Sequence, residues 1–374
     1  MNFDLNEEQE VIRDLAEQVF AGQSTVERVK ATEKSSGFDR ETWEQLAASG
    51  VQALCVPEEN GGSGFGSVEL SIALMAQGRH VALVPLWTTG VASLALADYG
   101  TAEQRRMLNG IADGSTIVTL ALAEFGANDV SRPATTASVS GNQIRVKGTK
   151  PAVPYAQHAD IALVSVSLDD GRPALVLLPI ATAGVSVVPV STTNNEPQAH
   201  LDIDCTLPVS AILGSDESGA TEHDGREMLR SVFELAVVAL ASLQVGVAEG
   251  SLALTATHLA TRKQFGKPLS AFQATTQRAA DGYITTEAMR VTTLNAAWRL
   301  AEGFDARRDV AVAAYWGSEG AQQVVTAAQH LHGGIGADID YPVHRYFLWG
   351  IQLATQLGSA SSHLARLGQL IART

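Results

Sequence analysis

The sequence predicts an α+β fold with a helical domain first, a β-domain in the middle and a four-helix bundle last. Capping residues and helix-period apolar positions dominate the first third of the chain. Short runs of Val, Ile and Thr, separated by turn residues, then replace them. Long apolar helical stretches return in the last part. The predicted domains are residues 1–116, 117–215 and 222–374.

The helical character of the first domain depends on caps and on periodicity. Asn6 precedes a stretch in which Val11, Leu15 and Val19 share one helical face. Asp39 precedes a second helix, and Gly50 is placed to end it.

The middle domain is predicted to consist of short strands. Its apolar runs are rich in β-branched residues, and pairs containing Gly, Asn or Asp lie between them. The expected strands are 137–140, 143–146, 161–166 and 174–178, with turns at 141–142, 169–171 and 194–195.

The last domain is predicted to contain long helices joined by short connections, which is typical of a four-helix bundle. Pro268 and Gly303 interrupt the apolar periodicity, and a loop at 333–342 interrupts it again. The expected helices are about 223–262, 270–302, 307–332 and 343–372.

Charge and composition exclude several classes of partner. The chain has 374 residues and a formal charge of −14, which argues against nucleic acid or an anionic membrane as the main partner. Cys55 and Cys205 have no metal-ligand spacing and read as buried thiols of a reducing compartment. The N-terminus is acidic without an apolar signal region, and the apolar runs are expected to be too short to span a membrane. We therefore expect a soluble cytoplasmic protein.

Four stretches, taken in order along the chain, resemble one known family. They are a glycine-rich loop at 57–66, AEFGAND at 123–129, RKQFG at 262–266, and HGGIG at 332–336 followed by Tyr341 and Arg345. In this order the chain resembles the acyl-CoA dehydrogenase family along essentially its whole length. Its third and fourth predicted bundle helices most resemble the divergent bacterial members that pair as unlike subunits in steroid side-chain degradation.

The resemblance implies a site for FAD in the last domain. Arg262 offers a planar fork that can clamp the pyrophosphate, and glycines let backbone N–H groups approach phosphate oxygens. In the family, these residues reach across the dimer interface to the neighbouring subunit's flavin. A purely structural reading stays open, in which the arginine ends a helix and the glycines make a tight turn. The implied cofactor residues are Arg262, Phe265, Gln273, His330, Gly333, Gly334 and Gly336, with His330 where the family usually has Gln.

The other half of a flavin site departs from the family pattern. Ala152 stands where the family has the aromatic residue that shields the flavin ring, and Pro154 where it has a hydroxyl. Ala123 replaces the usual Thr and Phe125 the usual Pro. The chain's own flavin-ring site is therefore predicted to be damaged.

The position of the catalytic base is also changed. Dehydrogenation removes an α-proton, which needs a positioned carboxylate, and the family usually supplies a Glu where this chain has Leu357. A minority of relatives place the Glu on the first bundle helix, at the position of Ala236 here. The nearest carboxylate is that of Glu234, two residues earlier. Two residues of an α-helix correspond to a rotation of about 200°, so Glu234 faces away from that position. Glu234 is a candidate base only if the helix contains a bulge or the alignment shifts, and otherwise a solvated or interface charge.

Three other titratable residues have structural interpretations. Glu124 is expected to anchor a loop, and His332 and His344 to orient the glycine loop. No carboxylate–histidine cluster has zinc spacing, so no metal is expected.

The predicted function is an accessory subunit of a heteromeric, FAD-dependent acyl-CoA dehydrogenase. A catalytic partner subunit would carry the base, in an assembly expected to be α2β2. The acyl-CoA substrate is expected to be bulky and steroid-derived. Two alternatives stay open: a homomeric dehydrogenase using Glu234 or another base, and a flavin-free scaffold subunit.

Overall fold

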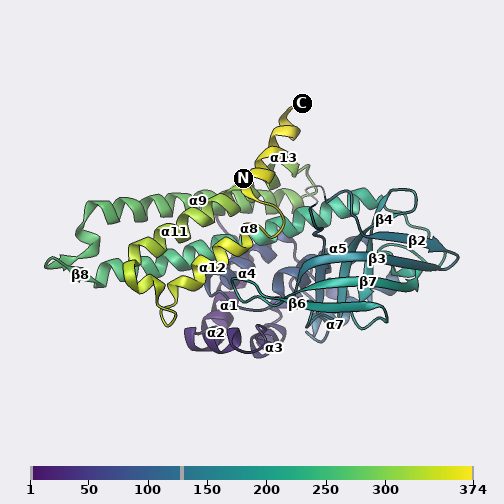
Figure 1. Cartoon of the computed structure of the whole chain (residues 1–374), viewed down its shortest axis with the longest axis horizontal. Coiled ribbons are helices and arrows are strands. Elements are labelled where there is room, and N and C mark those ends of the chain that lie inside the picture. The colour runs from purple at the N-terminus through teal and green to yellow at the C-terminus, as the bar shows by residue number, and fades with distance from the viewer. Residues whose placement is uncertain (1–2, 127–129, 373–374) are drawn as a thin grey trace. The chain divides into compact units, whose positions relative to one another are not determined.

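A computed structural model describes residues 3–126 and 130–372 of the chain. The chain divides into two compact units. Unit 1 contains residues 1–30, 67–82 and 237–374, and unit 2 contains residues 31–66 and 83–236. Along the chain, helices are followed by strands and then by helices again, as the sequence predicted (Figure 1). The residue boundaries of the three predicted domains stay a prediction.

The first helices begin and end at the predicted caps. The side chain of Asn6 accepts a hydrogen bond from the N–H of Gln9 over 2.8 Å, and Asp39 accepts one from Thr42 over 3.0 Å. Gly50 ends its helix in the left-handed conformation, with φ of 78°. The elements are α1 (Glu7–Gln23), α2 (Val26–Glu33), α3 (Arg40–Ser49), α4 (Ser67–Arg79), α5 (Leu86–Tyr99), α6 (Ala102–Arg105) and α7 (Met107–Ala112).

The buried face of α1 differs by one position from the stripe that periodicity marked. Val11 is 66% exposed, whereas Ile12, Ala16 and Phe20 are buried. Both stripes repeat at helical spacing, and the stripe containing the large Phe20 ring is the one that packs inward. Periodicity therefore identified the helix without identifying its core face.

Unit 2 contains a twisted, mostly antiparallel sheet with the order β1-β4-β2-β3-β7-β6, and β5 pairs with β4. The predicted turns are confirmed, since each lies between paired strands. β3 runs on to Pro154, beyond its predicted end. The strands are β1 (Val118–Ala121), β2 (Thr136–Ser140), β3 (Gln143–Pro154), β4 (Ile161–Leu168), β5 (Pro173–Pro179), β6 (Val185–Val190) and β7 (Gln198–Pro208).

The last helices confirm three of the four predicted ones. The fourth, expected over 343–372, is wrong because the chain breaks at 354–359. Gly358 has φ of 120°, and a Cβ there would lie 2.9 Å from Nε2 of His363, so the turn requires glycine. The elements are α8 (Gly225–Thr261), β8 (Lys263–Gln264), β9 (Lys267–Pro268), α9 (Gln273–Ala301), α10 (Arg307–Tyr315), the π-helical turn η5 (Trp316–Gly320), α11 (Ala321–His332), the 3₁₀ turn η6 (Gly333–Ala337), α12 (Val343–Leu353) and α13 (Ala360–Ala372).

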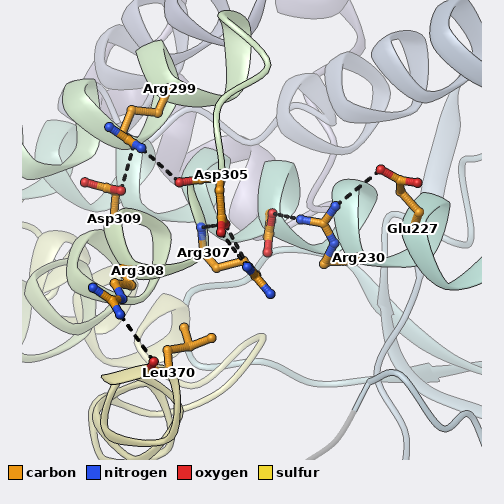
Figure 2. A network of polar contacts seen from close by, with 9 residues as sticks. Glu227, Arg230, Arg299, Asp305, Arg307, Arg308, Asp309 and Leu370 are labelled. Atoms are coloured by element: carbon orange, nitrogen blue, oxygen red, sulfur yellow. Dashed lines mark hydrogen bonds and ion pairs between the residues drawn. The ribbon is translucent and has the colours of Figure 1, made fainter. Parts of the chain in front are cut away.

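A polar network supports the helix ends on one side of the bundle. Arg299 pairs with Asp309 over 2.8 Å and donates to the carbonyl of Asp305 over 3.0 Å. Arg308 donates to the carbonyl of Leu370 over 3.4 Å, which attaches the end of α13 to the start of α10 (Figure 2).

The expectation that the apolar runs are too short to span a membrane does not hold for α8 by length and composition alone. This helix contains an 18-residue window with mean hydropathy of 1.9. Of that window, 89% is buried inside the chain, as in the core helix of a folded domain.

Candidate functional site

The RKQFG stretch forms a hairpin at the end of the bundle, where α8 passes into α9 (Figure 1). Phe265 and Gly266 make its turn with φ of 50° and 79°. The ring of Phe265 is 92% exposed and meets the ring of Phe272 edge-on, with centroids 6.3 Å apart. This turn projects an aromatic side chain away from the bundle core.

Arg262 lies at the base of this hairpin with its guanidinium exposed. Its carbonyl accepts from the N–H of Leu269 over 2.8 Å, which closes the hairpin. Within residues 3–126 and 130–372, its side chain forms no ion pair with a carboxylate. Gln273, the first residue of α9, is also exposed. Both side chains can therefore reach a bound anion.

The glycine loop begins where α11 ends. Gly333 has φ of 63° and ψ of −140°, a conformation that glycine adopts readily. A Cβ at Gly333 or Gly334 would meet no atom within 4 Å, whereas one at Gly336 would lie 2.9 Å from the carbonyl of Gln329. The first two glycines thus present open backbone, and the third is needed for packing. His330 is exposed on the last turn of α11.

Two imidazoles bring the hairpin and the glycine loop together. His258, one turn before Arg262, stacks on His332 with ring centroids 4.5 Å apart. His332 is buried, and its Nδ1–H donates to the carbonyl of Ala328 over 2.8 Å. Burial lowers the pKa of both histidines, and His332 and then Arg262 lower that of His258 further. The predicted FAD residues from the two stretches therefore lie at one end of the bundle.

The histidines of this region support the loop as the sequence indicated. His344 Nδ1 donates to the carbonyl of Tyr341 over 2.7 Å, and the ring of Tyr341 packs 5.3 Å from that of His332. Among the described residues, no group of three His, Cys, Asp or Glu side chains could hold a metal ion.

The segment around Ala152 in unit 2 is shaped by a bulge between Lys150 and Val153. Ala152 has φ of 47°, and its N–H donates to Nδ1 of His200 on β7 over 3.1 Å. The exposed ring of Phe125 meets the His200 ring edge-on at 5.4 Å. This backbone N–H is therefore already bonded inside the chain.

A buried ion pair lies behind that segment. Nζ of Lys150 is 2.5 Å from Glu124 and donates to Ser165 over 2.8 Å. Burial lowers the pKa of Lys150 to about 8, while Glu124 acts to raise it. Glu124 also accepts from the N–H groups of Ala134 and Thr135. Glu124 thus anchors a loop, as predicted, although residues 127–129 of its stretch lie outside the described residues.

Glu234 is not a solvated charge, which corrects one of its two interpretations. Its side chain is 1% exposed and lies 3.4 Å from Arg230, four residues earlier on α8. Arg230 also pairs with Glu227 (Figure 2). Ala236, the alternative base position that the resemblance implied, is buried as well. The carboxylate of Glu234 therefore has a structural role in supporting α8, whether or not it has another.

Leu357 lies in the turn between α12 and α13. It lines a cavity of about 20 Å³ whose other walls include Gln244, Ser318 and His363. His363 is the one titratable side chain among these. The sequence motifs did not identify it, because its position, six residues after Leu357, matches none of them. A histidine within an apolar helical stripe was the feature that could have indicated a buried polar site.

Comparison with known protein families gives two matches. Residues 6–115 match the family described as acyl-CoA dehydrogenase, N-terminal domain. Residues 223–365 match the family described as acyl-CoA dehydrogenase, C-terminal domain.

Individual relatives agree. The acyl-CoA dehydrogenase FadE27 of Mycobacterium tuberculosis is 34% identical, over 100% of both chains. The solved Tcur3481-Tcur3483 steroid ACAD is 43% identical with a TM-score of 0.91, over 98% of each chain. A chain of the ChsE4-ChsE5 complex of M. tuberculosis is 33% identical with a TM-score of 0.92, over 100% of each chain.

Proposed function

Because this chain belongs to the acyl-CoA dehydrogenase family, we propose that it is the accessory subunit of a heteromeric, FAD-dependent member. It contributes contacts to a flavin held mainly by a partner subunit, and the partner carries the base. The observation that carries this proposal is that residue 357, where the resemblance to the family places the base, is a leucine, which cannot accept a proton.

The end of the bundle fits a dinucleotide cofactor. The guanidinium of Arg262 is exposed and forms no ion pair within the described ranges, so a pyrophosphate can bind it without displacing a carboxylate. A Cβ added at Gly333 or Gly334 would meet no atom of the described residues within 4 Å, so their backbone is open to an anion. Bound FAD would supply the hydride acceptor, and these residues would hold its phosphates.

The β-domain does not fit the flavin ring. Ala152 has no aromatic surface, and its N–H donates to His200. Pro154 has neither a hydroxyl nor an N–H, and its carbonyl accepts from Thr119. The chain thus favours lending contacts to a neighbour's flavin over holding a flavin of its own.

The partner and the substrate are inferred from relatives. One similar solved structure is the Tcur3481-Tcur3483 steroid ACAD, and another is the ChsE4-ChsE5 complex. We infer an α2β2 assembly with a catalytic acyl-CoA dehydrogenase subunit, acting in the cytoplasm on a bulky, steroid-derived acyl-CoA.

A homomeric dehydrogenase using Glu234 is the second candidate. Glu234 is buried and forms an ion pair with Arg230 over 3.4 Å, which favours a structural role for its carboxylate over a catalytic one. A flavin-free scaffold is the third candidate, and the exposed Arg262 argues against it.

Purification with and without the partner tests the proposal. We expect the chain alone to bind little FAD and to show no acyl-CoA dehydrogenase activity, and the co-expressed pair to contain FAD and turn over. A homomer with one FAD per chain and robust turnover would contradict the proposal.

A further inference from the structure

The cavity beneath Leu357 has a polar wall. Gln244 on α8, Ser318 in η5 and His363 on α13 line it. Their exposed fractions are 2%, 7% and 7%, so all three side chains are buried. The rest of the wall is mainly apolar, and among residues 3–126 and 130–372 no Asp, Glu, Lys or Arg side chain lines the cavity.

Gln244 has one hydrogen-bonding atom in use and one open. Its Nε2 donates to the carbonyl of Gly350 over 2.9 Å, which fixes the orientation of the amide. Its Oε1 is buried and accepts no hydrogen bond from any residue that the structure describes. Because a buried acceptor without a donor is unfavourable, a donor is expected in the cavity.

His363 offers a second acceptor. Burial, followed by the charge of Arg366, lowers its pKa to about 4, against the effect of its hydrogen bond with the Gly358 backbone. The ring is therefore neutral at physiological pH, with one N–H and one bare nitrogen. The N–H forms the hydrogen bond with the Gly358 backbone, so the bare nitrogen is left to accept a hydrogen bond from a donor in the cavity.

We propose that this cavity is a binding site for a single water molecule. The water donates to Oε1 of Gln244 and to the bare nitrogen of His363, and it accepts from the hydroxyl of Ser318. Buried waters typically make about three hydrogen bonds, and these partners supply that number.

The size and charge of the cavity select water over other ligands. A water needs roughly 10–15 Å³, so a volume of about 20 Å³ admits one molecule and no larger ligand. A cation would be desolvated without a compensating carboxylate in the wall, which is strongly unfavourable.

The water would connect three elements that meet at the turn carrying Leu357. Ser318 lies in the π-helical turn and lines the cavity. Gly317 beside it leaves little room for a side chain, because a Cβ would lie 3.1 Å from that of Ala241. The water would thus lie beside the turn at 354–359, two residues of which, Leu357 and Gly358, line the cavity. This site stands on the geometry of unit 1 and does not depend on the proposed function.

A crystal structure of the protein at a resolution that shows ordered solvent tests the proposal. We expect one isolated peak about 2.7–3.2 Å from Oε1 of Gln244. An empty cavity, or a Gln244 turned so that Oε1 meets a protein donor, would overturn it.

Two glutamine variants sharpen the test. Gln244→Met preserves length but removes the acceptor, so the peak should disappear. Gln329→Met is the control, because Gln329 also donates to a backbone carbonyl, that of Gly336, but does not line this cavity; there the peak should stay. A peak that persists in Gln244→Met would show that the amide does not hold the molecule and would contradict the assignment. If Gln244→Met does not fold, the wild-type density decides alone.

Discussion

Leu357 has no atom that can accept a proton, whereas Glu234 has two carboxylate oxygens buried next to Arg230. We predict that Glu234→Gln leaves turnover of the complex within a few-fold of wild type, because the proposed base belongs to the partner subunit. Glutamine preserves the size of the side chain and removes its basicity, so the variant tests proton abstraction alone. A general base contributes about 10²–10⁴-fold. A loss of that size, with FAD content and assembly unchanged, would move catalysis to α8 of this chain.

The pKa of His363, lowered from 6.5 to about 4, makes stability depend on pH. Between these two values the unfolded chain binds more protons than the folded one, so stability falls as the pH falls from about 6.5 to about 4. The full shift corresponds to roughly 3 kcal/mol.

Urea unfolding at pH 7 and pH 4.5 measures this dependence. We expect the loss between the two pH values to be smaller in His363→Gln than in wild type, because glutamine does not titrate. Equal losses in the two proteins would mean that His363 is already protonated in the fold.

At the scale of elements, helix ends were predicted well where a cap marks them, as at Asn6 and Asp39. The break in the last helix was missed because Leu353 and Leu357 continue the apolar period across it. A local signal was present: Oγ of Ser359 accepts from the N–H of Ser362 at the start of α13, and Ser is a preferred cap. If Gly358 is taken as the end of one helix and Ser359 as the N-cap of the next, the sequence predicts two helices here.

Alanine substitutions at two neighbouring glycines distinguish the structural role of the glycine loop from its proposed role in binding FAD. Gly333→Ala places a side chain at φ of 63° and ψ of −140°, so it should destabilise the protein by about 1–3 kcal/mol. Gly334→Ala meets no atom within 4 Å and should leave stability nearly unchanged, yet weaken FAD binding in the complex by crowding the phosphates. Thermal unfolding and FAD titration of both variants provide the measurements. Full FAD affinity in a stable Gly334→Ala would remove the loop from the proposed cofactor site.

At the scale of the whole molecule, the sequence predicted the order of helices and strands because each depends on local patterns. The environment of Ala152 could not be predicted, since His200 is distant in sequence and reaches it only through pairing of β3 with β7. The stacking of His258 on His332 likewise joins the ends of two separate helices. The residues at 152 and 154 indicated from sequence which groups are missing from the flavin-ring site. The long-range contacts that those residues make instead could be seen only in the structure.

We propose that this chain contributes contacts to a flavin held mainly by the partner subunit. Arg262→Ala in the co-expressed complex tests this claim most directly. Losing a charged contact to the pyrophosphate should cost about 1.5–3 kcal/mol, or roughly ten- to a hundred-fold in FAD affinity. Lys263→Ala is the matched control, because Lys263 is the neighbouring exposed cation and its loss should change affinity little. FAD titration of the two complexes gives the answer: a selective loss in Arg262→Ala is the predicted result. Unchanged affinity in Arg262→Ala, or equal losses in both variants, would contradict the claim.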